Sequence, residues 1–375
     1  MRNLVLLPIL LLSFLSCTKH PKDNIIRPLR TTSGDFTAKA TKSVQLSTIN
    51  EVLIDDIYMI EYYLDRIYVF DQGEKCLLIF TSEGNLIKKL IRGKGPGELM
   101  DPMGISCYQN RLIITDRNLI KYYSLEGEFV QYKKLPRGCF ATCVTSLPNG
   151  NFLTYGMSPD FSKELKADYR SNQFYYYHIL DSTLTKEILP IVTLSMECGG
   201  MERGKPFHFY KNHYLLAEGI GNHLLIFNGE NVVDTYTIDF EGFTFNDEDL
   251  KKTKYAYLDL INAGSRYGFI DKVNETKDLI TFRYWRKGTE QPILKPTILY
   301  SKRSAKTADF SEVLKSVGIP EVELMNTRDD DFICLLQPSD FTEEQLNQFK
   351  KQGLINTSVT PDSNPVVIFI TVKER

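Results

Sequence analysis

Two stretches of the sequence repeat one pattern and decide the fold: Asp65-Arg-Ile-Tyr-Val-Phe-Asp71 and Asn110-Arg-Leu-Ile-Ile-Thr-Asp116. Each is followed by a second apolar run, a tight turn that contains Glu-Gly, and a third run. Asp71 and Asp116, which close the two stretches, are 45 positions apart. Short β-rich runs joined by Gly, Asp and Asn turns, at a period of about 40–45 residues, are typical of propeller blades. The sequence therefore predicts an all-β propeller in which each repeat is one four-stranded blade.

The rest of the chain continues this rhythm with three interruptions. A polar insertion covers residues 156–173, and residues 246–261 are expected to form a short helix with acidic residues at its start. A second helical insertion is expected before the last strand. Ser339 or Thr342 would be its N-cap, and Gly353 would end it. Short helical insertions are therefore expected within a single β domain.

The two ends of the domain are expected to pair with each other. Residues 36–46 contain a strand that precedes the first blade, whereas the final strand, residues 366–371, leaves the last blade one strand short. Pairing of these segments would close the ring and remove a sheet edge that could otherwise aggregate. This count favours six blades, with seven as the main alternative, and makes residues 36–375 one domain.

The N-terminal residues have the features of a secretion signal. Arg2 gives a positive start, residues 4–15 are apolar, and Cys17 follows a small residue. This run is too short for a membrane-spanning helix but suits a signal peptide. We expect residues 1–17 to be a lipoprotein signal peptide that ends at the lipobox Cys17, the lipidation site, with an ordinary secretion signal as the alternative. Residues 18–35, polar and aperiodic, are expected to be a tether.

The segment between the two repeats carries the most specific resemblance. Gly93-Lys-Gly-Pro-Gly-Glu98, followed by Pro102-Met-Gly104-Ile105, resembles the NHL-type repeat. More closely, residues 57–136 are similar to six-bladed β-propeller lipoproteins of bacterial envelopes, within the NHL/TolB-like propeller superfamily. Beyond residue 136 the resemblance is limited to the spacing of the predicted strands and to the features of the two chain ends. It implies a lipid-anchored protein of the bacterial cell envelope, at the outer membrane or facing the periplasm, and most members of the family have no assigned activity.

One face of the propeller is expected to bind a partner, because the long and charged loops gather there. Arg92, Lys94 and Glu98 lie in the first crossing between blades, where the two cations could hold a carboxylate, a phosphate or an acidic sugar. The alternative is that the glycines make a tight crossing and that Glu98 pairs locally. Arg117 and His223 belong to turns of the same face.

Arg283-Tyr-Trp-Arg286 supplies the remaining candidates for ligand binding. Trp285 is the single tryptophan of the chain, and Arg283 and Arg286 flank it. An aromatic ring beside guanidinium groups suits a sugar or an aromatic anion, although packing is the plainer interpretation. The docking face itself is expected to comprise the 92–98 crossing, the 156–173 insertion, the 218–223 turn and the loop 286–294 that follows this segment.

The sequence favours a non-catalytic binding or scaffold module for a glycan, peptide or envelope protein. The chain has no His-Glu-x-x-His or Gly-x-Ser-x-Gly motif, so no catalytic residue, metal ligand or cofactor is predicted. A net charge of −2 gives no reason to expect nucleic acid, and contact with the membrane is expected through the lipid anchor alone. Two alternatives stay open: a propeller enzyme, resembling metal-dependent lactonases or sugar dehydrogenases, and a purely structural subunit of an envelope complex.

Overall fold

The computed structural model describes most of the chain after residue 23. The described residues are 24–48, 53–135, 140–147, 149–157, 174–180, 185–191, 207–217, 221–250, 254–289 and 293–375. The predicted signal peptide, Cys17 and most of the 156–173 insertion lie outside them.

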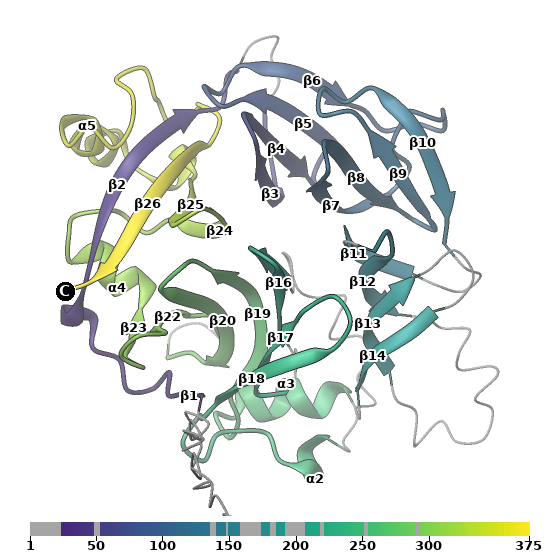
Figure 1. The fold of residues 1–375 in the computed structure, drawn as a ribbon. Helices are drawn as coiled ribbons and strands as arrows, with labels where there is room; N and C mark the ends of the chain where they lie inside the picture. The colour runs from purple at the N-terminus through teal and green to yellow at the C-terminus, as the bar shows by residue number, and fades with distance from the viewer. Residues whose placement is uncertain are drawn as a thin grey trace, which may run out of the picture.

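The described strands form six sheets around a common centre (Figure 1). Sheet 1 contains β3 (Ile57–Tyr63), β4 (Arg66–Asp71), β5 (Cys76–Thr81) and β6 (Leu86–Leu90). Sheet 2 contains β7 (Pro102–Tyr108), β8 (Arg111–Asp116), β9 (Leu119–Tyr123) and β10 (Phe129–Lys134). Sheet 3 contains β11 (Phe140–Ser146), β12 (Phe152–Met157), β13 (Phe174–Leu180) and β14 (Thr185–Ile191). The two repeats of the sequence therefore form sheets 1 and 2, as predicted.

The second half of the chain builds the other three sheets. Sheet 4 contains β15 (Phe207–Tyr210), β16 (His213–Ala217), β17 (His223–Phe227) and β18 (Val232–Ile238), with β1 (Ile25–Ile26) added at its edge. Sheet 5 contains β19 (Gly268–Glu275), β20 (Leu279–Lys287), β22 (Thr297–Ser301) and β23 (Thr307–Asp309), with β21 (Ile293–Leu294) beside β20. Sheet 6 contains β24 (Glu323–Arg328), β25 (Asp331–Leu336), β26 (Val366–Glu374) and β2 (Phe36–Gln45).

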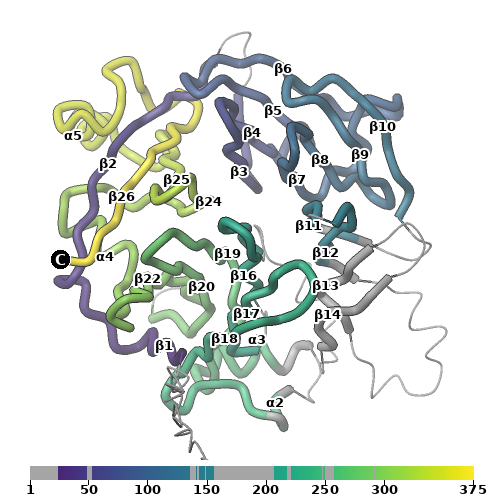
Figure 2. Tube along the Cα trace, in the orientation of Figure 1, coloured from purple at the N-terminus to yellow at the C-terminus, as the bar shows by residue number. Residues whose placement is uncertain are grey.

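The predicted pairing of the two chain ends is confirmed. β2 pairs antiparallel with β26, in a register that runs from Phe36 opposite Glu374 to Gln45 opposite Val366. Figure 2 shows β2 and β26, the last strand, side by side along one edge of the molecule. β2 is thus the fourth strand of sheet 6, and its neighbour β26 has strand partners on both sides.

The expectation that residues 18–35 form a tether is wrong for residues 24–35. β1 pairs in parallel with β18, Ile26 is fully buried, and Thr31 then bridges Thr307 at the start of β23. A 3-10 helix, η1 (Ser33–Asp35), leads into β2. Residues 24–45, which we call the strap, therefore contact β18 of sheet 4 and β23 of sheet 5 and pair with β26 in sheet 6. Two-residue strands have no periodicity, so the sequence could not show this.

Helices lie outside the sheets, and both predicted helical insertions are present. α2 (Asp247–Leu250) and α3 (Lys254–Asn262) form the insertion predicted at residues 246–261, and α5 (Glu343–Lys351) forms the one predicted before the last strand. Thr342, not Ser339, is the N-cap of α5 and forms a capping box with Gln345. A further helix, α4 (Phe310–Lys315), was not predicted. Asp309 caps it, and it buries Phe310, Val313 and Leu314.

The core consists of apolar and aromatic side chains packed between neighbouring sheets. Tyr68, Tyr123 and Tyr214, from sheets 1, 2 and 4, are fully or almost fully buried in one cluster. Cys76 and Cys334 lie in the core, where each packs as a small apolar side chain. Among the described residues, no helix is long and apolar enough to cross a membrane.

Candidate ligand-binding site

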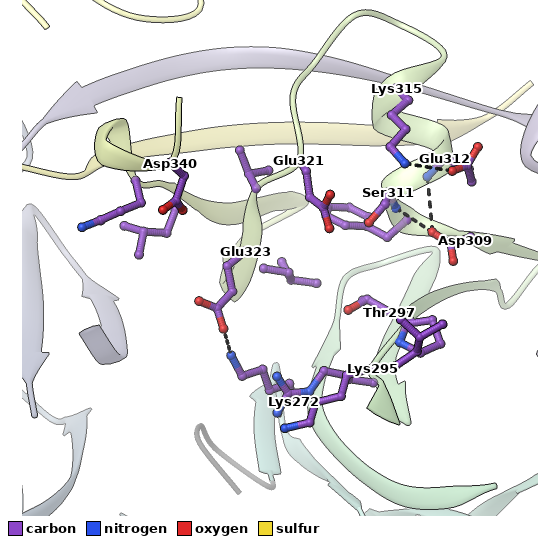
Figure 3. Close-up of a pocket in the computed structure, with 18 of the residues that line it drawn as sticks. Lys272, Lys295, Thr297, Asp309, Ser311, Glu312, Lys315, Glu321, Glu323 and Asp340 are labelled. Carbon is purple, nitrogen blue, oxygen red and sulfur yellow. Dashed lines mark hydrogen bonds and ion pairs between the residues drawn. The ribbon is translucent and has the colours of Figure 1, made fainter. Parts of the chain in front are cut away.

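A polar cavity of about 610 Å³ lies between sheets 5 and 6 (Figure 3). Its walls come from the ends of β20 and β23, the start of β22, helix α4, and the start of β24 and end of β25. The charged side chains that line it are Lys272, Arg283, Arg286, Lys295, Lys315, Asp309, Glu312, Glu321, Glu323 and Asp340. A volume of this size is within the range of pockets that hold small ligands. We call it the sheet 5–6 cavity.

An irregular strand brings Lys272 to this cavity. β19 is buried along its whole length, yet its register with β20 breaks twice, and Phe269 and Lys272 have positive φ angles of 53° and 45°. Such backbone is uncommon for residues other than glycine and is typical of bulges. Lys272 is almost fully buried and forms an ion pair with Glu323 of β24, which links the two sheets. Burial and the nearby positive charge of Arg283 lower the pKa of Lys272, against the opposing effect of Glu323.

Arg283 of β20 is held in place by Asp271 on the neighbouring strand β19. Asp271 and Arg283 are register partners, and the carboxylate accepts hydrogen bonds from Nε, at 2.6 Å, and from a terminal nitrogen of the guanidinium group. Both side chains are largely buried. A bidentate pair of this kind fixes the guanidinium plane. Arg283 therefore lines the cavity as a neutralised group.

Arg286 differs from Arg283, because its guanidinium group lacks an ion-pair partner among the described residues. Its Nε is buried and has no hydrogen-bond acceptor. Asp309 also lines the cavity: burial raises the pKa of its carboxyl group, whereas two backbone N–H groups and the positive charge of Arg286 act in the opposite direction. A buried donor without an acceptor is costly. The guanidinium group also forms no ion pair in the described part of the chain, so an anionic ligand group that reached its open side would be bound favourably.

Trp285 belongs to the packing beneath the cavity. Its side chain is 4 % exposed and lies against Phe269, with ring centroids 5.1 Å apart. Lys295 covers the ring, with Nζ 4.0 Å from the centroid, and itself lines the cavity. The ring is thus closed to a stacked sugar, which favours the packing interpretation of this tryptophan.

The opposite wall of the cavity is acidic. Glu321 and Asp340 both line it, and neither carboxylate has a hydrogen bond or ion pair within the described ranges. Figure 3 shows these two carboxylates on one side of the cavity and Lys272 and Lys295 on the other. Lys315 and Glu312 lie on the same wall and pair with each other at 3.1 Å. Sheet 5 therefore contributes most of the cations of the cavity together with Asp309 of β23, whereas Glu321 and Asp340 lie on the side of sheet 6 and its flanking segments.

The first predicted group, Arg92, Lys94 and Glu98, lies far from this cavity, in the crossing from β6 to β7. Glu98 accepts a hydrogen bond from the N–H of Gly95 at 2.7 Å, and a Cβ at Gly93 would lie 2.0 Å from its Oε2. Its carboxylate thus closes the turn, as the structural interpretation expected. Arg92 and Lys94 are exposed. They remain predicted ligand residues, but the structure separates them from Arg283 and Arg286.

The other two predicted residues are also apart from the cavity. Arg117 is exposed directly after β8, and its N–H donates to Asp101 O within the same crossing at 3.2 Å. His223 begins β17 in sheet 4 and is partly buried. The loop 218–220 beside it and residues 158–173 lie outside the described residues. Of the eight predicted residues, the structure therefore brings Arg283 and Arg286 together at one cavity.

Sequence reasoning missed most of the cavity. Lys272 looked like an ordinary strand residue, and Lys295, Glu321 and Asp340 stand singly between the predicted strands, with no charged pattern around them to mark a site. A signal was available only for Arg283 and Arg286, because two arginines flank the single tryptophan. The described part of the chain contains no group of three or more His, Cys, Asp or Glu side chains arranged to hold a metal ion.

These sheets define a β-propeller-like fold, mostly β with four-stranded antiparallel sheets and few helices. Residues 31–371 match the family described as "Domain of unknown function (DUF4934)", and the chain belongs to this family. No curated protein matches it.

Three solved structures with low sequence identity resemble the chain. A Bacteroides fragilis protein described as exported has a TM-score of 0.69 at 16 % identity, covering 93 % of this chain and 99 % of its own. A member of the DUF4221 family from Bacteroides vulgatus has a TM-score of 0.55 at 10 % identity, covering 92 % and 100 %. Virginiamycin B lyase from Staphylococcus aureus has a TM-score of 0.42 at 9 % identity, covering 90 % and 99 %. At these identities the likeness concerns the fold alone.

Proposed function

We propose that this protein is a lipid-anchored binding module of the bacterial cell envelope, built as a closed six-bladed propeller. It would hold a glycan, peptide or protein partner on the face that carries the sheet 5–6 cavity, without catalysing a reaction. Each of the six sheets would be one blade, and the β2–β26 pairing would close the ring. The signal-like residues 1–17 support export and lipidation at Cys17.

The binding role is supported mainly by Arg286, whose guanidinium group has no ion-pair partner among the described residues. This side chain lines a cavity of ligand size and has a buried Nε without an acceptor, whereas Arg283 beside it is neutralised by Asp271. A structural arginine is normally paired when it is buried. Arg286 is therefore the side chain in this cavity to which we expect a ligand to bind.

The test is a binding screen against glycan and peptide arrays, followed by titration of the best ligand. Arg286→Gln is expected to weaken binding at least tenfold, about 1.4 kcal/mol. The matched control is Arg111→Gln, which removes an exposed arginine at the start of β8, and Arg92→Gln tests the rival site in the crossing between sheets 1 and 2. Equal affinity of Arg286→Gln and the unmodified protein would show that the cavity is not the site. Loss of binding in Arg92→Gln alone would instead place the ligand at the crossing.

A further inference from the structure

The segment that would connect the lipid anchor to the folded domain is shorter than the predicted tether, residues 18–35. Asn24 already belongs to the strap: its carbonyl accepts a hydrogen bond from Thr237 N–H, and its Nδ2 donates to the carboxylate of Asp234. Asn24 is seven positions after Cys17. A segment of this length spans at most about 25 Å, even when it is fully extended. A lipid on Cys17 would therefore hold the start of the strap within about 25 Å of the bilayer surface.

The strap joins the domain at a defined position on the rim of the ring. β1 pairs in parallel with β18, the outer of the four consecutive strands of sheet 4. Asn24, which precedes β1, contacts Asp234 near the start of β18, so the chain enters the domain beside the first residues of that strand. Two of these residues, Val232 and Val233, are 37 % and 56 % exposed. Two consecutive apolar side chains thus face solvent where the anchor segment reaches the domain.

We propose that the first residues of β18, with Val232 and Val233, rest on the lipid bilayer in which Cys17 is anchored. The inference rests on the lipid anchor of the proposed function and adds a protein surface to it, whereas the sequence predicts contact with the membrane through the lipid alone. Apolar side chains that enter the boundary between headgroups and acyl chains leave water, which is favourable. Two valines bury too little area to hold a protein at a membrane by themselves, so this surface orients a molecule that the lipid retains.

The arginines of the strap do not provide a cationic surface for anionic lipids, because both are paired within the domain. Arg27 Nε lies 3.5 Å from the carboxylate of Asp239, and Arg30 forms an ion pair with Glu241. Glu230, in the turn before the two valines, is exposed and would be repelled by anionic headgroups. A bilayer of zwitterionic lipid is therefore the expected partner.

A second group of exposed apolar side chains lies on the opposite side of the ring. Ile87 belongs to β6, and Val130 and Tyr132 belong to β10, the outer strands of sheets 1 and 2. Figure 1 shows β6 and β10 across the ring from β1 and β18. A domain of this length is on the order of 50 Å across, about twice the span of the anchor segment. The anchor segment therefore favours the sheet 4 surface over the surface of sheets 1 and 2.

Quenching of tryptophan fluorescence by brominated lipids would measure this contact. Val233→Trp and the matched control Val130→Trp each place a tryptophan at an exposed valine of an outer strand. Each variant would be expressed in bacteria as the full chain with its signal, purified in detergent and reconstituted into phosphatidylcholine vesicles with or without bromine on the acyl chains. Both reporters have the same intrinsic preference for the membrane interface, and the unmodified chain gives the contribution of the buried Trp285. Thermal unfolding of each variant checks that the fold is intact.

The tryptophan of Val233→Trp is expected to lose most of its fluorescence in brominated vesicles, whereas that of Val130→Trp keeps it. Insertion of about twenty Gly and Ser residues after Thr18 should weaken the quenching of Val233→Trp, because it adds roughly 25 Å of mean reach. Cys17→Ser combined with Val233→Trp should not be quenched, since this chain lacks the acceptor thiol for the lipid.

The other outcomes separate this inference from the proposed function. If the purified chain floats with the vesicles but Val233→Trp is not quenched, the anchor stands and the docking surface is overturned. Equal quenching of Val130→Trp and Val233→Trp would also overturn it, because the ring would then have no preferred side toward the bilayer. A chain that does not float with the vesicles would contradict the lipid anchor and, with it, the inference.

Discussion

Asp71 and Asp116 stand at the same position of the two sequence repeats, and the structure shows why both copies need an aspartate. Asp71 accepts hydrogen bonds from the backbone N–H groups of Asp55 and Asp56, and Asp116 accepts them from Met100 and Asp101. In each copy the donors lie 16 and 15 residues before the aspartate. Each carboxylate thus fastens the segment that enters a sheet to the end of that sheet's second strand.

Asp116 also forms a buried ion pair that can be tested. Lys121 Nζ lies 2.7 Å from its carboxylate, and the two side chains are 3 % and 0 % exposed. Asp116→Asn leaves the lysine buried without an anion, so we expect a loss of about 3–5 kcal/mol in the free energy of unfolding, measured by urea denaturation. The control, Glu128→Gln, breaks the exposed Lys88–Glu128 pair and should change this free energy by less than about 1 kcal/mol. Equal effects of the two variants would refute the structural role of Asp116.

The strap differs from its sequence-based prediction more than any other described segment does. Thr237 N–H donates to Asn24 O and Asp239 N–H to Ile26 O, both at 2.8 Å, while Asn24 Nδ2 bonds the carboxylate of Asp234. These contacts cover the edge of sheet 4. Strand edges that stay open invite pairing with other chains, so the strap protects the molecule as well as tying three sheets together.

Ile26 is the side chain that should hold the strap in place, because it is fully buried. Ile26→Ala is expected to cost about 2–5 kcal/mol. In hydrogen-exchange measurements the amides of Thr237 and Asp239 should lose protection, since their acceptors lie in the strap. Val233→Ala, at a side chain that is 56 % exposed on the same edge strand, is the control. Unchanged protection of both amides in Ile26→Ala would mean that β1 does not depend on this contact.

A second link between elements joins sheets 4 and 5 and depends on pH. Glu275 of β19 is almost fully buried, and its carboxylate contacts His213 Nε2 at 2.8 Å and Lys302 Nζ at 3.0 Å. Burial by itself would raise the pKa of Glu275, but the hydrogen bond from His213 and the charge of Lys302 lower it below the ordinary value of 4.5. A lowered pKa means that the folded protein holds the charged form better than the unfolded chain does. This stabilisation is therefore present above pH 4.5 and is lost as the pH falls through the lower folded value.

Glu275→Gln tests this link. The variant should be less stable at pH 7, because His213 and Lys302 lose their anionic partner. As the pH falls below about 4.5, the difference in the free energy of unfolding between the unmodified protein and the variant should shrink. Chemical denaturation at pH 7 and at pH 4 measures both values. A difference that stays constant or grows toward pH 4 would contradict the assigned direction.

At the level of elements, the sequence was informative where a pattern spans several residues. The repeats predicted the strands of sheets 1 and 2, and the shortage of one strand at the C-terminus predicted the β2–β26 pairing. β1, β23 and α4 have two, three and six residues, too few for a period of 2 or 3.6 to be visible. The strap and the cavity wall at α4 could therefore be found only in the structure.

At the scale of the whole molecule, the ring explains why the candidate site could be predicted only in part. The cavity gathers side chains from residues 272 to 340, and no local spacing relates Lys272 to Asp340. Arg283 and Arg286 could be singled out as unusual, but their different states depend on Asp271, which a break in the β19 register places opposite Arg283. The sequence predicted that all the candidate ligand-binding residues lie on one face of the propeller. In the structure these residues are distributed over different sheets, so that only Arg283 and Arg286 line the same cavity.

Lipidation of Cys17 would determine where the whole molecule is located. If Cys17 is lipidated, palmitate labelling of bacteria that express the protein should mark the unmodified chain and should not mark Cys17→Ser. The variant should be recovered as a released or unprocessed form, since it lacks the acceptor thiol. Cys334→Ser, which changes a fully buried cysteine of sheet 6, is the control and should be labelled normally. Equal labelling of Cys17→Ser and the unmodified chain would refute the anchor.

A crystal structure of the full chain, grown with the best ligand from the binding screen, tests both the fold and the site. We predict six blades in a closed ring and ligand density in the cavity between sheets 5 and 6, beside the guanidinium group of Arg286. Ligand density at the crossing beside Arg92 and Lys94, with the cavity empty, would contradict the assigned site. A different number of blades, or an unpaired β2, would contradict the architecture.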